Sequence, residues 1–306
     1  MNKIIQHFIS PFGQIEKVEF FRKALYLFLF LNTLTLLPIA HDLFGYYGVI
    51  GTRGWNTNIS FLNQGSYGLI NLLSHPANSH YSWVYILFIL GQMSFLILGL
   101  IGKWPRLSSF MVYFFTVNLF MKGYLAFTGG EVLVNFMLFY LMFVHPPKKE
   151  GVGGELQNIL NQAFYKIMLI QVCLVYFFSA LYKLYDAPWV EGKALMYISR
   201  IDGYSTLPFE WLFAENPTLS MFATYATLAY MILFPFIVWV KKIKTPFLMI
   251  GLIFHIGISF GMGIFSFGVI MILMYILFLD KEQIQTIKEK IKRRVPNRVI
   301  GIFSRQ

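Results

Sequence analysis

Residues 171–204, QVCLVYFFSALYKLYDAPWVEGKALMYISRIDGY, decide how this chain folds. The stretch begins as an apolar helix that carries one lysine, Lys183, in its last turn. The chain leaves the helix through residues 186–188, and a compact polar module follows at 189–193. An apolar helix that gives way to a polar turn predicts a helix that reaches one surface of a membrane.

The composition of the whole chain supports a membrane protein. Its 306 residues are 57% hydrophobic and only 13% charged, whereas about a quarter of the residues of a soluble domain are charged. So few charges cannot cover a water-exposed surface. The net charge of +11 alone would permit nucleic-acid binding, but the basic residues flank apolar segments, so we expect no nucleic-acid partner. The single cysteine, Cys173, excludes an intramolecular disulfide.

The fold class we expect is all-α: a polytopic transmembrane bundle of about eight helices. A bilayer core requires about 20 apolar residues per helix, and fewer where neighbouring helices shield it. The expected spans are 22–42, 82–102, 106–127, 131–146, 161–185, 217–240, 245–263 and 265–280. We therefore expect a transmembrane domain over 1–280 and a basic cytoplasmic tail over 281–306. We expect no cleavable signal peptide, and a surface helix near residues 5–12.

The distribution of lysine and arginine predicts the orientation. With both termini in the cytoplasm, 19 of the 25 basic residues lie on the cytoplasmic side, as the positive-inside rule requires. The longer loops, at about 43–81 and 186–217, then face outward together with the tight turn 127–131. Polar residues collect in these outer loops. The basic tail indicates contact with anionic lipid.

Lys183 is the first candidate functional residue. It could be a lysine that extends its amine from the end of a helix toward water. It could also be a base, because an amine that is partly withdrawn from water favours its neutral form. Asp186, three residues later, favours the structural interpretation because it can pair with the ammonium group across one helical turn.

Two further residues combine a polar group with an apolar segment. His255 lies near the middle of an expected span, where it could join two helices by a hydrogen bond or act on a bound polar group. Glu131 could stabilise a helix N-terminus or contribute to a site, and Asn135 would lie on the same helix face. The tyrosines 176, 182, 185 and 197 suit a membrane-interface belt or the wall of an aromatic pocket.

Other classes of site have little support. His75 and His80 lie five residues apart without a third ligand, so we expect no metal centre. The sequence contains no phosphate-binding loop and no dinucleotide-binding glycine motif. Proline and glycine occur at 235, 257, 261 and 263, but they do not form interrupted helices in matching halves, so the signal for a transporter is weak.

Three motifs carry a family resemblance. YFFSALYKLYDAPWVEGKALMYISR at 176–200, FHIGISFGMGIFSFGVIMILMYILFL at 254–279 and GGEVLVNFMLFYLMF at 129–143 resemble the vitamin K-dependent gamma-glutamyl carboxylase, and more broadly its HTTM membrane domain. The chain also resembles the small bacterial HTTM proteins of the SdpB type, which assist production of a secreted antimicrobial peptide. The carboxylase continues into a large lumenal part that the sequence after 280 does not resemble.

The resemblance implies a site and a cofactor. It implies that Lys183 is the base toward a reduced quinone and that His255 lies in the same membrane region. The substrate-binding residues expected around them are Trp189, Glu191, Gly192, Glu131 and Tyr182.

Three functions follow as hypotheses. The first is a membrane enzyme that acts on a quinone or a peptide at the outer face. The second is a non-catalytic partner in the maturation or export of a secreted peptide, which would contact that peptide or another membrane protein. The third is a transporter. The resemblance also implies a bacterial inner or cytoplasmic membrane as the location.

The orientation can be tested by cysteine labelling. In a Cys173-free background, cysteines at Ser74 and Glu191 should react with a membrane-impermeant thiol reagent in intact cells, whereas a cysteine at Lys148 should not. The opposite pattern would reverse the orientation and move the expected site to the cytoplasmic side.

Overall fold

The computed structural model describes residues 11–45, 48, 69–73, 83–123, 128–147 and 151–294. The expected surface helix near the N-terminus, His75, His80 and the end of the basic tail lie outside the described residues, apart from positions 11 and 12 of that helix. The described part of the chain is helical: α2 (Ile15–Leu36), η1 (Leu37–Ile39), α3 (Ala40–Phe44), α5 (Leu69–Leu73), α6 (Val84–Leu100), α7 (Pro105–Gly123), α8 (Gly129–Leu141), α9 (Val152–Leu184), α10 (Ala187–Val190), α11 (Ala194–Ile198), α12 (Leu207–Phe213), α13 (Pro217–Ile237), α14 (Lys241–Gly261), α15 (Phe265–Met274), η5 (Tyr275–Phe278) and α16 (Lys281–Arg294).

The all-α class is confirmed, but the expected number of helices is wrong. Each of the eight expected spans falls on a helix, yet only four segments in the described residues are long and apolar enough to cross a membrane. These are Ile15–Phe44, α9, α13 and α14; α6, α8 and α15 with η5 are shorter apolar helices. The additional helices, such as α10, α11 and α12, are only one or two turns long, so a search for about 20 apolar residues could not find them.

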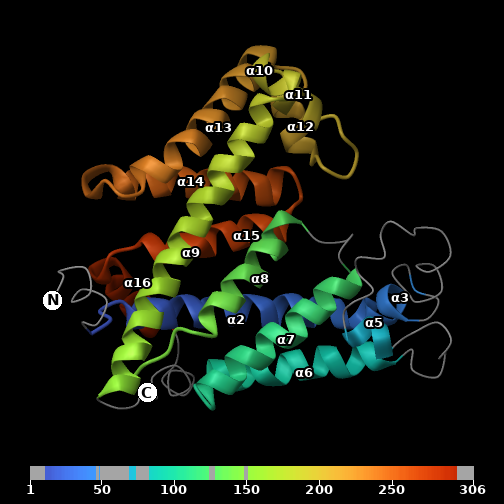
Figure 1. Cartoon of the computed structure of the whole chain (residues 1–306). Coiled ribbons are helices and arrows are strands. Elements are labelled where there is room, and N and C mark those ends of the chain that lie inside the picture. The colour runs from blue at the N-terminus through green and yellow to red at the C-terminus, as the bar shows by residue number, and fades with distance from the viewer. Residues whose placement is uncertain are drawn as a thin grey trace. The chain divides into compact units, whose positions relative to one another are not determined.

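The described residues divide into two compact units (Figure 1). The first contains Met1–Phe164 and Gln285–Gln306, and the second contains Tyr165–Ile284. Helix α9 contributes its first part to one unit and its second part to the other. The expected boundary between a transmembrane domain and a tail at residue 280 stays a prediction.

In the first unit, α6 and α7 run side by side and α2 packs on α6. Few polar groups lie between these apolar helices, and they bond one another. The side-chain amide of Gln92 contacts Thr33 on α2 at 2.9 Å and Thr116 on α7 at 2.8 Å. Such bonds stabilise packing between membrane helices, where an unpaired polar group is costly.

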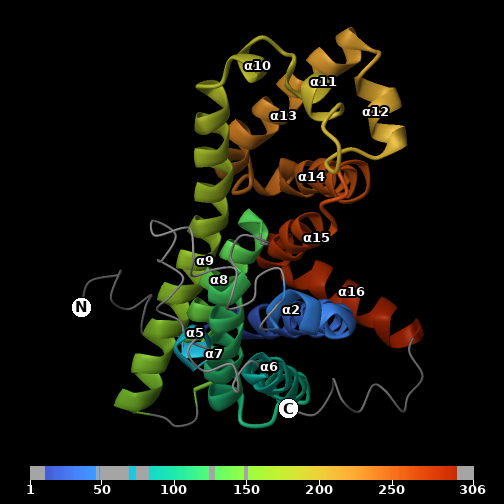
Figure 2. The ribbon, with the colours of Figure 1, turned by 90° about the vertical axis from the view of Figure 1, so that its right-hand side faces the viewer.

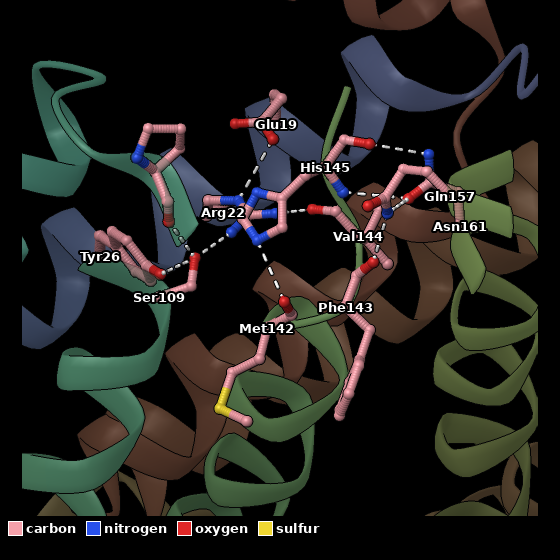
Figure 3. Close-up of polar contacts among 11 residues, drawn as sticks. Glu19, Arg22, Tyr26, Ser109, Met142, Phe143, Val144, His145, Gln157 and Asn161 are labelled. Atoms are coloured by element: carbon pink, nitrogen blue, oxygen red, sulfur yellow. Dashed lines mark hydrogen bonds and ion pairs between the residues drawn. The ribbon is translucent and has the colours of Figure 1, made fainter. Parts of the chain in front are cut away.

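A buried arginine forms a polar cluster at one end of this unit (Figure 3). Arg22 of α2 is 3% exposed, and its Nε lies 3.3 Å from Glu19 Oε1. Its two terminal nitrogens donate hydrogen bonds to Ser109 Oγ of α7 and to the carbonyl oxygen of Val144. One guanidinium group therefore connects α2, α7 and the segment that follows α8.

The same segment is held from its other side by α9. The amide of Asn161 accepts a bond from His145 N at 3.0 Å and donates one to His145 O at 2.8 Å. Gln157 donates to the carbonyl oxygen of Phe143 at 2.8 Å and accepts from Arg106 at 2.9 Å. We call Arg22, Glu19, Gln157 and Asn161 the polar clamp. Arg22, Gln157 and Asn161 bond backbone groups that no helix satisfies, and Glu19 pairs with Arg22.

Loss of the arginine should destabilise the protein strongly. We expect Arg22→Met to lower the free energy of unfolding by about 3–5 kcal/mol, because Glu19 and the Val144 carbonyl lose their buried partner. Tryptophan fluorescence during unfolding in detergent measures the change. The matched control is Arg293→Met on exposed α16, which should change the stability by less than about 0.5 kcal/mol. Equal effects of the two variants would contradict a structural role for the clamp.

Candidate functional site

Three tyrosines and a histidine form a hydrogen-bonded chain inside the second unit. Tyr176 Oη of α9 lies 2.5 Å from His255 Nε2 of α14 and 2.7 Å from Tyr275 Oη of η5. Tyr230 Oη of α13 lies 2.8 Å from Tyr275 Oη. All four side chains are buried, and His255 is 1% exposed. We call this set the Tyr–His chain.

The direction of the hydrogen bonds in the chain depends on the His255 tautomer. If Nε2 accepts from Tyr176, each hydroxyl donates toward the histidine and Nδ1 carries a proton. If Nε2 donates instead, the direction reverses and the Tyr230 hydroxyl donates away from the chain. His255 Nδ1 has no hydrogen-bond partner among the described residues, so either tautomer leaves one polar group of the chain unsatisfied within the described protein.

Aromatic rings surround this chain. The Tyr176 ring stacks on Phe234 with ring centroids 4.0 Å apart, and the Tyr230 ring stacks on Phe247 at 4.6 Å. The Phe254 ring meets the His255 ring edge to face at 4.9 Å. This packing excludes water and strengthens the hydrogen bonds that it encloses. The arrangement favours the interpretation of His255 as a residue that joins helices.

Lys183 lies on the same face of α9 as Tyr176 but nearer the end of the helix. It follows Tyr176 by seven residues, or about 10 Å along the helix axis, with the buried Ala180 between them. Its Nζ lies 4.9 Å from the ring centroid of Trp189, a cation–π contact, and no ion pair with Asp186 forms in the described structure. Among the described residues, Lys183 and His255 share no hydrogen bond.

The polar module after α9 is attached to α13. Tyr225 Oη donates to the carbonyl oxygen of Val190 at 2.9 Å, and Leu195 N donates to Thr224 Oγ1 at 3.2 Å. Gly192 ends α10 with φ of +73°, which favours glycine, and the Tyr225 ring leaves little space for a side chain there. These contacts fix the module to the second unit.

The other residues expected to bind substrate have local partners or face outward. Glu191 bonds Lys193 at 2.8 Å, and this carboxylate raises the pKa of Lys193. Glu131, in the first unit, forms a capping box with Thr128 at the start of α8. Tyr182 is 76% exposed. The binding roles of Trp189, Gly192 and these residues stay predictions, as do the catalytic roles of Lys183 and His255.

Sequence reasoning missed Tyr230 and Tyr275 as partners of His255. Both tyrosines lie within apolar segments rather than at their ends, where a membrane-interface belt would place them. A tyrosine in the middle of an apolar segment indicates a buried hydroxyl group, and such a group requires a hydrogen-bond partner. The spatial order of the helices, which the sequence does not provide, selects the partner.

Comparison with known proteins finds similarity to two proteins of a bacterium. The sporulation-delaying protein SdpB of Bacillus subtilis (strain 168) is 29% identical over 202 residues, which are 61% of this chain and 62% of SdpB. The chain is thus similar to SdpB over this region. The uncharacterized protein YitO of the same organism is 25% identical over 240 residues, 73% of this chain and 72% of YitO. Thus the chain matches less than two thirds of the length of SdpB and somewhat more than two thirds of YitO.

No protein-family profile and no solved structure matches the chain. The resemblance to the HTTM domain and to the carboxylase therefore rests on the sequence motifs alone. The four helices that are long and apolar enough to cross a membrane, together with the similarity to SdpB, support an integral membrane protein.

Two glycines of α14 provide a test of the Tyr–His chain. A methyl group at Gly251 would collide with the hydroxyls of Tyr230 and Tyr275, whereas nothing lies within 4 Å of one at Gly257. We expect Gly251→Ala to cost about 1–3 kcal/mol of stability through overpacking. Gly257→Ala should be neutral or stabilise the helix by up to about 1 kcal/mol. Unfolding in detergent measures both, and equal stabilities would contradict the described packing.

Proposed function

We propose that this protein is a non-catalytic membrane partner in the production of a secreted peptide. The observation that carries the proposal is the similarity to the sporulation-delaying protein SdpB over 202 residues, which are 61% of this chain and 62% of SdpB. The expectation of an enzyme that acts on a reduced quinone has no comparable support, because no comparison links the chain to the carboxylase.

The contacts of the two expected catalytic residues support a partner. A general base must reach the proton that it removes, within hydrogen-bond distance or through one water. The Lys183 ammonium rests on the Trp189 ring, and His255 is enclosed by the Tyr–His chain and its aromatic neighbours. Each residue already makes a structural contact. Lys183 lies about two helical turns along α9 from Tyr176, which is the hydrogen-bond partner of His255.

The connection between α9 and α13 offers the surface that a partner needs. Its short helices α10, α11 and α12 are fixed to the second unit: Arg200 donates to Ala214 O at 2.8 Å, and Thr206 N donates to Gly261 O at 2.9 Å. Several large apolar side chains of this connection are nevertheless exposed, including Leu207 at 81% and Trp211 at 70%. A firmly held surface that exposes aromatic residues suits contact with an apolar peptide, and also with the outer membrane interface.

Deletion of the gene tests the proposal. Mass spectrometry of the culture medium should show that one secreted peptide disappears or changes in mass in the deletion strain, and that the wild-type gene restores it. An unchanged set of secreted peptides would reject the function.

Substitution of Lys183 distinguishes the hypothesis of a non-catalytic partner from that of an enzyme with Lys183 as its base. Lys183→Arg should retain the secreted product, because arginine also stacks on tryptophan, whereas it cannot act as a base near neutral pH. Lys183→Met should lose the contact, at a cost of about 0.5–2 kcal/mol of stability, and keep most of the product. Product levels are compared at matched protein levels, with Lys193→Met as the control in an exposed ion pair. Loss of product with Lys183→Arg would favour the general base.

A further inference from the structure

Helix α16 has the composition of a helix that lies on a membrane surface. Its 14 residues, KEQIQTIKEKIKRR, contain six basic and two acidic side chains. Three isoleucines recur at 284, 287 and 291, a spacing that places them on one face. An apolar stripe on a strongly basic helix is typical of contact with a membrane interface rather than of a helix that spans it.

The first turns of α16 are anchored on the N-terminal end of α2. Ile284 is 2% exposed, and Gln285 Nε2 and Lys288 Nζ donate to Glu16 Oε1 at 2.8 and 2.6 Å. Lys288 Nζ also lies 5.9 Å from the ring centroid of Phe20. The position of α16 relative to the start of α2 is therefore fixed by an ion pair, a hydrogen bond and a cation–π contact.

The direction of α16 follows from these contacts. Figure 2 views α2 close to its axis and shows α16 running across it. Ile15–Phe44 is long and apolar enough to cross a membrane. A helix that crosses the end of a membrane span runs along the membrane surface, at the level where headgroups meet water.

The charges of α16 are arranged around the apolar stripe as this position requires. On a helical projection, Lys281 and Lys292 lie beside one edge of the stripe and Lys290 beside the other, each about a quarter turn from its centre. Glu282 and Glu289 lie on the opposite face. All three lysines are exposed. A bilayer below the stripe would thus meet cations on both sides and keep the carboxylates in water.

One apolar residue of the stripe stays exposed. Ile291 is 48% exposed, although it lies on the same face as the buried Ile284. An exposed isoleucine between flanking lysines can enter the boundary between headgroups and acyl chains while the ammonium groups reach phosphates.

We propose that α16 docks on an anionic phospholipid bilayer, with Lys281, Lys290 and Lys292 on the lipid phosphates and Ile291 among the first acyl carbons. The partner is a lipid surface rather than a nucleic acid, because the basic side chains flank an apolar residue on a helix already held beside a membrane span. This proposal does not depend on the peptide partnership proposed above. It concerns how the protein contacts the lipid bilayer in which it lies.

A single fluorescent label tests the docking. The full chain with Cys173→Ser and Ile291→Cys carries one thiol, which is labelled with a polarity-sensitive fluorophore. The protein is placed in nanodiscs of phosphatidylcholine alone or mixed with phosphatidylglycerol. With the anionic lipid, access of a water-soluble quencher to the label should fall by about twofold or more, and high salt should reverse the change.

Charge variants identify the side chains responsible. Lys281→Gln, Lys290→Gln and Lys292→Gln together should abolish the difference between the two lipid compositions. The matched control is Arg293→Gln, an exposed cation away from the stripe, which should preserve the difference. Equal quenching in both lipids, or an unchanged response of the triple variant, would overturn the proposal. Protection of the label by added nucleic acid in neutral lipid, without protection by phosphatidylglycerol, would also overturn it.

Discussion

The packing of the helices depends on partners for the charged and polar groups that are buried among apolar side chains. Arg22 illustrates the constraint, since a guanidinium taken out of water is stable only with an opposite charge and further acceptors. Its partners come from its own helix, from α7 and from the segment after α8. Because three separate segments must be in place at once, satisfying one charge also fixes how these segments pack.

The polar clamp also satisfies the backbone that follows α8, which ends after 13 residues. The last carbonyl groups of α8 accept from the backbone N–H groups of residues 142–144, but the carbonyl groups that come next lie outside the helix, where an unpaired backbone group is costly in a membrane protein. In this chain the carbonyl oxygens of Phe143, Val144 and His145 accept bonds from side chains of α9 and α2. These bonds stabilise a non-helical segment whose backbone would otherwise be unpaired, and they connect it to α2 and α9.

Hydropathy located the long helices of this chain because burying apolar side chains determines where they begin and end. It could not locate α10 or α12, whose stability comes from contacts such as Thr206 with Gly261 rather than from an apolar run. The same limit applies to the site. The sequence identified His255 as a buried polar group, but Tyr230 and Tyr275 become its neighbours only through the packing of α13 and η5. The sequence also identified Lys183 as a candidate functional residue. Its contact with Trp189 could not be predicted, because that contact depends on the conformation of the turn between the two residues.

The second unit thus separates its polar groups by environment. Inside, the Tyr–His chain is enclosed by rings, and a substrate would have to displace packed phenylalanine side chains to reach it. Close packing makes such displacement costly, because interiors contain few voids. Outside, the connection after α9 holds its backbone through hydrogen bonds to α13 and α14 while leaving Leu207 and Trp211 exposed. A rigid surface loses little conformational freedom on binding, which supports the association with a peptide that we propose for this part of the protein.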